Sequence, residues 1–279
     1  MITGATRLAA VIGSPIRHSL SPTILNAAFA ATDADWAFVA LEVAGGQGAA
    51  AVHAARTLGF GGLSVTMPHK AAACAAVDAT TAVAAELGAV NCVYRDGDVF
   101  VGDNTDGDGF LDGLRRDPGL DVSGLRCVVV GAGGAGRAVV RALSTAGAAD
   151  VAVLNRTPDR AVRAAALAGA AGRVGVTADV AAADLVVNAT SLGMAQSDPL
   201  PVDPDSLHAG QIVADLVYHP AVTPLLGEAR ARGATAVGGL GMLVHQAAHA
   251  YRRWTGGDPP IDAMTTAARH ALARRQTPG

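Results

Sequence analysis

Short runs of apolar residues alternate with longer mixed segments along nearly the whole chain. In the first half, the apolar runs have the length of buried strands and lie at Leu8–Ile12, Trp36–Val43 and Gly62–Thr66. The segments between them, Thr23–Ala31 and Gln47–Leu58, have helical composition. Alternation of strand and helix is typical of an α/β fold with a mostly parallel sheet. We predict such a sheet for the first half.

A hairpin and a boundary follow. A strand predicted at Ala89–Tyr94 leads through Asp96-Gly97 into Val99–Val101, and an Asp-Gly pair between apolar runs favours a tight hairpin. The polar segment Gly107–Arg116 predicts a short helix, and Asp117-Pro118-Gly119 predicts a loop. We expect two domains to meet in this region.

The alternation then starts again. Six further strands are predicted at Cys127–Val130, Val151–Leu154, Arg173–Val176, Leu185–Asn188, Ile212–Leu216 and Thr235–Val237. Six short apolar strands with helices between them are what a doubly wound nucleotide-binding sheet requires. After Gly241 the pattern is helical, over Met242–Trp254 and Ile261–Arg274.

Composition excludes several classes of function. The chain has 279 residues, 51% of them apolar, and a net charge of −3, which argues against nucleic acid or an anionic membrane as the main partner. No apolar stretch approaches the ~18 residues that a membrane helix needs, and the run after Arg7 is too short for a signal peptide. Cys74, Cys92 and Cys127 lack metal-ligand spacing, which favours reduced thiols in the cytoplasm.

A glycine-rich segment follows the strand Cys127–Val130 and opens a helix. Gly131 permits a tight turn, Gly133 lets the backbone approach a pyrophosphate, and Gly136 lets the helix pack close to the strand. The helix N-terminus supplies amide hydrogens for the anion. A bare glycine pattern also occurs in flexible loops, but the strand before it and the helix after it favour a dinucleotide site.

The end of the next strand distinguishes NADP from NAD. An NAD enzyme usually has an acidic residue there, which binds the ribose hydroxyls. This chain has Asn155-Arg156-Thr157, with Arg160 one turn later. A guanidinium can bind a 2′-phosphate through two hydrogen bonds, whereas a carboxylate would repel it. NADP(H) is therefore the predicted cofactor, the alternative being that Arg156 is a solvated surface charge.

Lys70 stands where a predicted strand runs into a helix that Pro68 helps to start. Thr66 is then at the carboxyl end of the strand, where ligands bind in open α/β sheets, and Lys70 is in the first helical turn. A helix N-terminus disfavours a cation, which suggests a role for Lys70, although most lysines are solvated surface groups. Asp106 lies in Gly102–Gly107, a segment that taken alone is more often a capping turn.

Together, Lys70 and Asp106 suit the reduction of a carbonyl group. Hydride attack leaves an alkoxide, which an ammonium both stabilises and protonates, and a carboxylate would orient that ammonium. Ser19 and Ser21, in the loop after the first strand, could bind a substrate carboxylate. Taken alone, an ordinary N-cap is the simpler interpretation of the two serines.

These motifs, taken in order, resemble one family, the shikimate dehydrogenases, over nearly the whole chain. The motifs are HSLSP at His18–Pro22, SVTMPHK at Ser64–Lys70, GAVN at Gly88–Asn91, GDNTDG at Gly102–Gly107, GAGGAGR from Gly131, NRT from Asn155, NATSLGM from Asn188 and GLGMLVHQAAHA from Gly239. Several ordered motifs in one chain are far more specific than any single one.

The resemblance implies a reaction and its residues. The reaction is the reversible reduction of 3-dehydroshikimate to shikimate with NADPH, in the chorismate pathway to aromatic amino acids. Lys70 corresponds to the catalytic lysine, and Asp106 to its partner. The residues implied to bind substrate are Ser19, Ser21, Thr66, Asn91, Asp106, Tyr218 and Gln246. The residues implied to bind NADP are Gly131, Ala132, Gly133, Gly134, Ala135, Asn155, Arg156, Thr157, Arg160, Thr190, Leu216 and Gly239.

The resemblance also implies a division of the chain. The C-terminal helices return to the first domain, so residues 1–106 plus 242–279 form a substrate-binding catalytic domain and residues 107–241 a Rossmann-type NADP-binding domain. Gln246 is expected in the cleft between them. His69 and His245 adjoin key residues and are expected to be packed or solvated rather than catalytic. The oligomeric state stays open, a homodimer being one alternative.

Three other functions compete with this one. The broader quinate/shikimate branch of the family tends to have threonine in place of Ser21 and an acidic residue in place of Arg156, so both positions favour the shikimate-specific enzyme. Methylenetetrahydrofolate dehydrogenases share the two-domain layout and a lysine, but not these motifs. A catalytically idle NADPH-binding regulatory protein would be expected to lack Lys70 or Asp106, and both are present.

Overall fold

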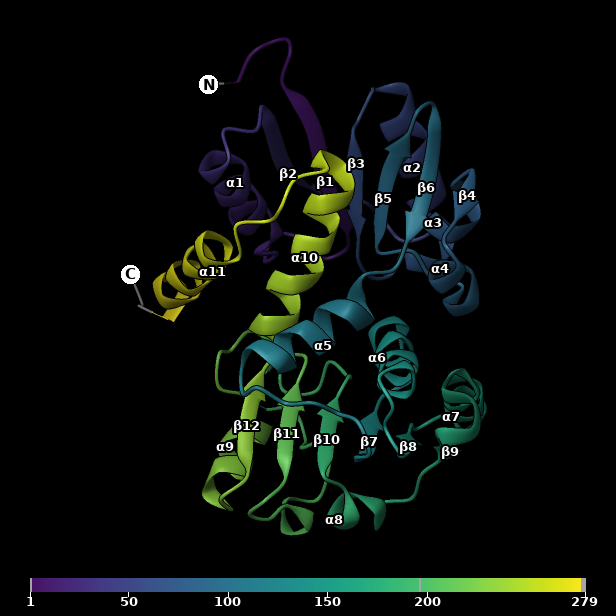
Figure 1. The fold of residues 1–279 in the computed structure, drawn as a ribbon, viewed down its shortest axis with the longest axis vertical. Helices are drawn as coiled ribbons and strands as arrows, with labels where there is room; N and C mark the ends of the chain where they lie inside the picture. Colours follow the sequence, from purple (N-terminus) through teal and green to yellow (C-terminus); the bar gives the residue numbers. More distant parts are fainter. Residues whose placement is uncertain (1, 196, 277–279) are drawn as a thin grey trace. The chain divides into compact units, whose positions relative to one another are not determined.

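The computed structural model describes residues 2–195 and 197–276. The chain forms two compact units, which we number 1 and 2. Unit 1 runs to Thr105 and resumes at Val244, and unit 2 comprises Asp106–Leu243. Figure 1 labels the helices and strands of both.

Unit 1 is built on a six-stranded sheet with the strand order β2-β1-β3-β5-β6-β4. Its strands are β1 (Arg7–Gly13), β2 (Trp36–Glu42), β3 (Gly62–Val65), β4 (Ala79–Thr80), β5 (Cys92–Asp96) and β6 (Val99–Asp103). Strand β1 is parallel to β2 and β3, and β4 is parallel to β6, whereas β5 is antiparallel to both of its neighbours. The mostly parallel sheet predicted for the first half is confirmed.

The helices of unit 1 come from both ends of the chain. They are α1 (Ser21–Ala31), α2 (Gly48–Thr57), α3 (Lys70–Ala76), α4 (Ala82–Leu87), most of α10 (Leu240–Thr255), and α11 (Ile261–Gln276). Helix α11 packs against α1 (Figure 1). Trp254 of α10 donates its indole N–H to the Val93 carbonyl at 2.9 Å and stacks on Phe38. The predicted return of the C-terminal helices to the first domain is therefore confirmed.

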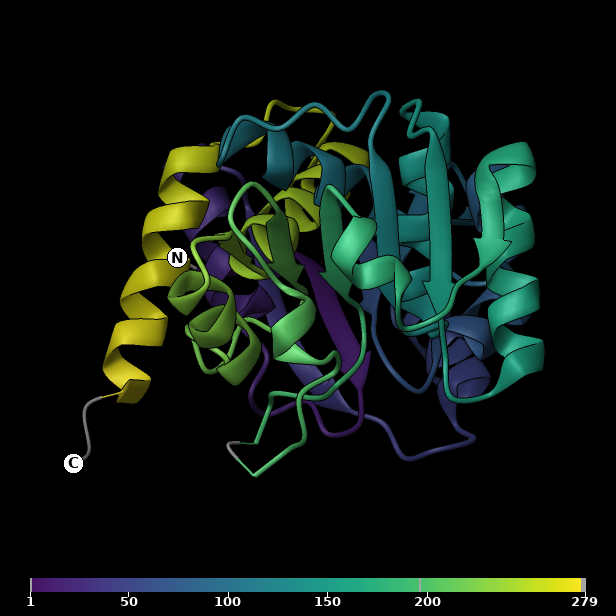
Figure 2. The same ribbon diagram turned by 90° about the horizontal axis from the view of Figure 1, so that it is seen from below.

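Unit 2 contains a second six-stranded sheet, with the order β12-β11-β10-β7-β8-β9. Its strands are β7 (Arg126–Val130), β8 (Asp150–Leu154), β9 (Gly172–Val174), β10 (Leu185–Asn188), β11 (Ile212–Asp215) and β12 (Thr235–Gly238). All pairings observed among the described residues of this sheet are parallel. This is the doubly wound order of a Rossmann fold, as predicted, and its strands can be followed from below in Figure 2.

The helices of unit 2 are short and pack on this sheet. They are α5 (Asp106–Arg116), α6 (Gly134–Thr145), α7 (Pro158–Ala165), α8 (Asp179–Ala182), α9 (Pro224–Ala231) and two 3₁₀ helices at Ala166–Ala171 and Pro204–Ser206. Helix α6 packs on β7 and β8, and α9 packs on β11 and β12. Central strand residues such as Val129 and Val187 are fully buried, because helices cover both faces of such a sheet.

Two local predictions need correction. Pro68 does not start helix α3: it lies in a turn in which the His69 amide donates to the Thr66 carbonyl at 3.0 Å, and α3 begins only at Lys70. The predicted hairpin is present, with Asp96 opposite Val99. Its turn, however, is formed by Gly97 and Asp98, because Asp96 still belongs to β5. No helix among the described residues is long and apolar enough to span a membrane.

Candidate active site and cofactor site

Lys70 is the only lysine in the sequence, since the other Lys+Arg residues, of 21 in total, are all arginines. It is the first residue of α3, half-buried, and its carbonyl accepts a hydrogen bond from the Val90 amide at 2.9 Å. A guanidinium stays protonated in proteins, whereas an ammonium can release its proton. The one lysine of the chain stands near the carboxyl end of β3, the end at which open α/β sheets generally bind ligands.

Asn91, adjacent to Val90, lies at the centre of a hydrogen-bond network in unit 1. Its Nδ2 donates to Thr105 Oγ1 at 3.1 Å and to Gln246 Oε1 at 3.4 Å. Its Oδ1 accepts from the Thr105 amide at 2.8 Å. The Thr105 hydroxyl also donates to the main-chain carbonyl of Gln246 at 3.1 Å. Two predicted substrate residues, Asn91 and Gln246, are thus brought together by one that was not predicted, Thr105.

Asp106 directly follows Thr105 and is the first residue of α5. It is only 5% exposed. A carboxylate is favoured there, because the N-terminal end of a helix carries partial positive charge. The hydrogen bonds of Val90 and Asn91 therefore connect the backbone at Lys70 to the residue that precedes Asp106.

A second buried carboxylate, Asp103, supports the same segment. It accepts hydrogen bonds from the Thr81 hydroxyl at 2.7 Å and the Asn104 amide at 2.8 Å, and it pairs with Arg253 of α10 at 2.9 Å. The Asn104 side chain donates to the Ala89 carbonyl at 2.9 Å. Asp103 and Asn104 thereby hold the turn that leads from β6 to Asp106, a role that the local sequence did not reveal.

The serine loop does not have the geometry of an ordinary N-cap. The N-cap of α1 is Leu20, which has no capping side chain, and Ser21 is already the first helical residue. Ser19 Oγ accepts a hydrogen bond from the Ser21 amide at 3.2 Å. The loop is braced from α11, where Arg275 donates to the His18 carbonyl at 2.7 Å. Both predicted serines therefore lie at the N-terminal end of α1, an arrangement that suits an anion.

Thr66 follows β3 and is half-buried, with its amide bonded to the Ile12 carbonyl at 3.0 Å. Its methyl group occupies the place that a side chain at position 13 would need, which only Gly13 leaves free. His69, in contrast, is 1% exposed and its Nε2 lies 2.8 Å from the Val43 carbonyl. Of the two alternatives expected for His69, packed or solvated, the structure shows the packed one.

In unit 2, the glycine turn has the geometry that a pyrophosphate requires. Gly131 adopts a φ of 108°, and a Cβ there would lie 2.9 Å from the Ala189 carbonyl oxygen. A Cβ on Gly136 would collide with the Gly131 carbonyl, whereas one on Gly133 would meet nothing within 4 Å. Helix α6 begins at Gly134. Open space over Gly133 and the amides of a helix N-terminus fit a dinucleotide phosphate.

The loop after β8 is tied to this turn. Asn155 Oδ1 accepts from the Ala132 amide at 3.1 Å, and its Nδ2 donates to the Thr157 carbonyl at 3.0 Å. Beside it, Arg137, Arg160 and Arg163 line a surface hollow together with Ala132, Gly133 and Gly134. Arg156, which the sequence favoured, is exposed and is not among the residues that line it.

The arginines of this hollow form no salt bridge with any residue that the structure describes. By contrast, arginines such as Arg126 and Arg173 of the same unit each pair with aspartates. Unpaired guanidinium groups beside a glycine turn fit a phosphate, which they bind through two parallel hydrogen bonds. Arg137 and Arg163 were missed because no local pattern distinguishes them from surface charges.

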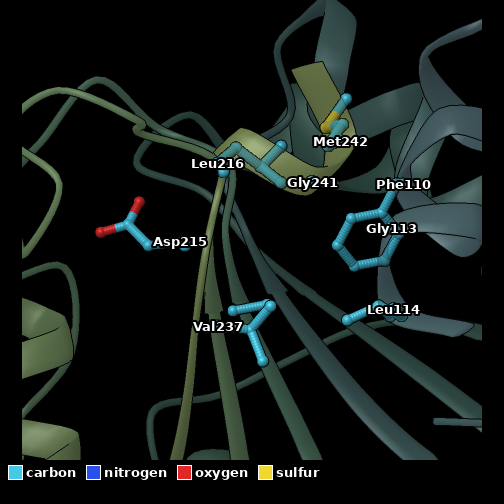
Figure 3. A pocket seen from close by; sticks show the side chains of 11 residues that line it. Phe110, Gly113, Leu114, Asp215, Leu216, Val237, Gly241 and Met242 are labelled. Atoms are coloured by element: carbon cyan, nitrogen blue, oxygen red, sulfur yellow. The ribbon is translucent and has the colours of Figure 1, made fainter. Parts of the chain in front are cut away.

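The remaining predicted residues lie at or just after the carboxyl ends of β10, β11 and β12. The Thr190 hydroxyl donates to Asn188 Oδ1 at 2.7 Å, and the Leu216 amide donates to the Asn188 carbonyl at 2.9 Å. Gly239 lies so close to the Leu216 carbonyl that a Cβ would not fit. Leu216 and Gly239 also line a small, mainly apolar pocket bounded by Phe110 and Met242 (Figure 3).

Comparisons with known proteins agree along the chain. Three family models match: a shikimate dehydrogenase substrate binding domain at residues 11–93, a shikimate / quinate 5-dehydrogenase at 115–194, and a shikimate 5'-dehydrogenase C-terminal domain at 239–269. The shikimate dehydrogenase (NADP(+)) of Moorella thermoacetica is 44% identical over 97% of this chain and 95% of the relative.

Solved structures give the same result. The shikimate 5-dehydrogenase of Thermus thermophilus, in complex with NADP(H) and shikimate, is 37% identical and has a TM-score of 0.89, covering 96% of this chain and 100% of that one. A quinate dehydrogenase from Corynebacterium glutamicum, in complex with NAD, is 34% identical with a TM-score of 0.86, over 95% and 99% of the two chains.

Proposed function

The chain belongs to the shikimate dehydrogenase family, and from this premise we propose that it catalyses the reversible, NADPH-dependent reduction of 3-dehydroshikimate to shikimate. The observation that carries the proposal is Lys70, the only lysine of the sequence, near the end of β3. A chain that otherwise uses arginine for its cations keeps an amine at the one position where the reaction needs a proton donor.

Unit 1 is proposed to bind the substrate. Ser19 and Ser21 would hold the carboxylate, which suits hydroxyl donors at the start of α1. Asn91, already fixed by Thr105 and Gln246, would bind a ring hydroxyl. Thr66, Gln246 and, from unit 2, Tyr218 would supply further contacts to the hydroxyls or the carboxylate.

Unit 2 is proposed to bind the cofactor. When bound, NADPH supplies the hydride that the reduction consumes. The turn Gly131–Ala135 and the N-terminus of α6 would hold the pyrophosphate. Asn155, Arg156, Thr157 and Arg160, joined by Arg137 and Arg163 of the hollow, would hold the adenosine with its 2′-phosphate. Thr190, Leu216 and Gly239 would face the rest of the molecule.

The proton step follows from the same residues. As hydride reaches the carbonyl carbon, negative charge develops on the oxygen, and the Lys70 ammonium would donate a proton to it. Asp106, buried at the start of α5, would orient the ammonium and join in the proton exchange. In the reverse direction, the neutral amine would accept the proton from the hydroxyl of shikimate.

Genetic complementation tests the proposal. Expression of the chain in a bacterial strain that lacks its own shikimate dehydrogenase is expected to restore growth without aromatic amino acids. The Lys70→Ala variant, produced at an equal level, is expected to fail. Absence of growth with the wild-type chain, despite soluble expression, would contradict the proposal.

A quinate dehydrogenase is the second candidate function, favoured by the likeness to the Corynebacterium glutamicum enzyme. Quinate differs from shikimate at the ring, so both would place a carboxylate on the serine loop. Ser21 and the arginines near Asn155 favour the shikimate- and NADP-using enzyme. A comparison of kcat/KM with both substrates and both cofactors distinguishes the two functions.

We infer that the protein acts as a homodimer and that it is located in the cytoplasm. Strand β2 is the outer strand of its sheet, and its Val39 and Leu41, together with Leu8 of the neighbouring β1, are each 39–44% exposed. A second copy would cover these apolar side chains and the unpaired strand edge. The three free cysteines fit a reducing compartment. Light scattering of the wild type and of Leu41→Lys tests the dimer, and cell fractionation tests the location.

A further inference from the structure

Three buried polar residues meet at the carboxyl ends of β10 and β11 in unit 2, and we call them the Asp215 cluster. Asn188 and Asp215 end these neighbouring strands and are register partners. Asn188 Nδ2 donates to Asp215 Oδ1 at 2.9 Å, and the Thr223 hydroxyl donates to Asp215 Oδ2 at 2.7 Å. The exposed fractions of Asn188, Asp215 and Thr223 are 0%, 1% and 1%.

The Asp215 carboxylate has neutral donors but no cation. Besides Asn188 and Thr223, the Val217 amide donates to it at 3.0 Å, and it forms no salt bridge with any described residue. Burial raises the pKa of Asp215 above its ordinary value. A buried carboxylate without a cation is costly, so a gain in stability does not explain it.

Asn188 fixes the loop that follows β10. Its Oδ1 accepts from the Thr190 amide at 3.1 Å and from the Thr190 hydroxyl at 2.7 Å. Its Nδ2 also donates to the Leu192 carbonyl at 3.0 Å. The Thr190 hydroxyl in turn accepts from the Leu192 amide at 3.1 Å. The side-chain amide of Asn188 therefore holds the segment from Asn188 to Leu192 by hydrogen bonds.

Asp215 and Thr223 fix the segment that follows β11. The bond to the Val217 amide holds the backbone between Leu216 and Tyr218. Thr223 is the N-cap of α9, and its Oγ1 accepts from the Leu226 amide at 3.3 Å. The Asp215 carboxylate thus accepts hydrogen bonds from the end of β10, from the loop after β11 and from the N-cap of α9.

Asp215 is among the residues that line the pocket that Leu216 lines, whereas Asn188 and Thr223 are not. In Figure 3, the Asp215 carboxylate points away from Phe110, Leu114 and Val237. The residues it holds are instead those proposed to contact ligands: Thr190 through Asn188, and Leu216 with Tyr218 through the backbone bond at Val217. Because its carboxylate is directed away from the pocket, Asp215 would act on a ligand through these neighbours.

We propose that Asn188, Asp215 and Thr223 are positioning residues for the cofactor, which preset the two loops that carry Thr190 and Leu216. The inference rests on the proposed cofactor contacts of Thr190 and Leu216. Presetting lowers the entropy that binding must remove from the loops. It also holds the cofactor in the orientation that the reaction needs.

The chain provides a matched control for Thr223. Thr81, in unit 1, is the N-cap of α4, accepts from the Ala84 amide at 3.3 Å and donates to Asp103 Oδ1 at 2.7 Å. Its bonds have the same lengths as the cap and carboxylate bonds of Thr223. Thr223→Val and Thr81→Val therefore remove hydrogen bonds of the same kind and length. Only Thr223 lies in unit 2.

The test measures NADPH binding by isothermal titration calorimetry and steady-state kinetics with 3-dehydroshikimate. Thr223→Val is expected to raise the Kd and the KM for NADPH about tenfold, since a lost bond to a charged group has that effect. The KM for the carbonyl substrate is expected to stay within about twofold. Thr223→Ser, which keeps the hydroxyl, is expected to restore NADPH binding, and Thr81→Val to leave it unchanged.

If Thr223→Val folds, two results would overturn the inference. One is a Thr223→Val protein that melts at a lower temperature but binds NADPH like the wild type; the other is an equal loss of NADPH binding in Thr81→Val. If Thr223→Val does not fold, hydrogen exchange of the wild type tests whether the two loops are preset. Residues 188–192 and 215–218 must then be protected before NADPH is added, and exchange at the rate of open loops would refute presetting. A wild type that binds NADPH but does not reduce 3-dehydroshikimate would refute only the proposed function.

Discussion

Asn91 and Thr105 hold each other by hydrogen bonds: the Thr105 amide donates to Asn91 Oδ1 at 2.8 Å, and Asn91 Nδ2 donates to Thr105 Oγ1 at 3.1 Å. Both residues are 3% exposed. The pair fixes a proposed substrate ligand against the residue that precedes Asp106. We therefore expect the position of the proposed substrate ligand Asn91 to depend on a side chain that need not touch the substrate.

Thr105→Val removes the hydroxyl of this pair while keeping its shape. We expect kcat/KM for 3-dehydroshikimate to fall about tenfold, because the Asn91 amide loses a buried partner. The Kd for NADPH should not change. Steady-state kinetics and calorimetry check both values. Thr57→Val, which removes an exposed hydroxyl bonded to the His53 carbonyl, is the control, and an equal loss in this variant would contradict the assignment.

Lys70 can be tested by amine chemistry, because its side chain and the N-terminus carry the only primary amines of the sequence. Trinitrobenzenesulfonate is expected to abolish turnover in proportion to the Lys70 modified, and shikimate should slow the reaction. Lys70→Ala is expected to lower kcat by about 10²-fold or more without weakening NADPH binding. Peptide mass spectrometry locates the label. Full modification of Lys70 with normal turnover would exclude it as the proton donor.

The arginine hollow predicts a specific loss of NADPH binding. Arg160→Ala and Arg163→Ala should each raise the KM for NADPH about tenfold, because a charge-assisted bond to the 2′-phosphate is lost. The KM for NADH, which lacks that phosphate, should stay the same. Arg230→Ala, an exposed arginine of α9 in the same unit, is the control. If the KM values for NADPH and NADH rise equally, the hollow does not recognise the 2′-phosphate.

Acid should weaken unit 2 through Asp184. Hydrogen bonds from Arg126 hold the pKa of this carboxyl below its usual range. Because the pKa is lowered on folding, the stabilisation is complete above pH ~4 and disappears as the pH falls through the lower, folded-state value.

Asp184→Asn should therefore lower Tm at pH ~7 by a few degrees at most, roughly 1–3 °C, since the pair is partly exposed. The difference from the wild type should shrink as the pH approaches ~3. Thermal melts at both pH values measure it. Glu42→Gln, which breaks the more exposed pair with Arg17, should change neither melt. A constant difference across the pH range would show that Arg126 is not the cause.

Local patterns predicted the parts of the fold that depend on local physics. The Gly131–Gly136 turn was found because tight turns and close helix packing leave no choice but glycine. The hairpin was found because an Asp-Gly pair between two apolar runs favours a tight turn, although the turn itself is formed by Gly97 and Asp98. The two-residue strand β4 was not found, since two residues carry no periodic pattern. Pro68 was misplaced because a proline near a helix start can also lie in the turn before it.

Local patterns did not reveal the supporting residues of the site, because these residues are far apart in the sequence and meet only in the folded chain. Thr105 meets Gln246 across 141 positions, and Arg253 meets Asp103 across 150. Arg137 becomes informative only when α6 and α7 place it beside Arg160 and Arg163. Motifs indicated which residues we expect to face the ligand, but the residues that hold them are fixed by tertiary contacts.

One measurement tests the central claim most directly: initial rates of NADPH and NADH oxidation, followed by absorbance, with 3-dehydroshikimate and 3-dehydroquinate, compared as kcat/KM under identical conditions. We expect 3-dehydroshikimate with NADPH to exceed every other combination by about 10²-fold or more, since each lost polar contact in a built site costs roughly a factor of ten. Equal or faster turnover of 3-dehydroquinate, or a preference for NADH, would contradict the account and favour the quinate-oxidising branch of the family.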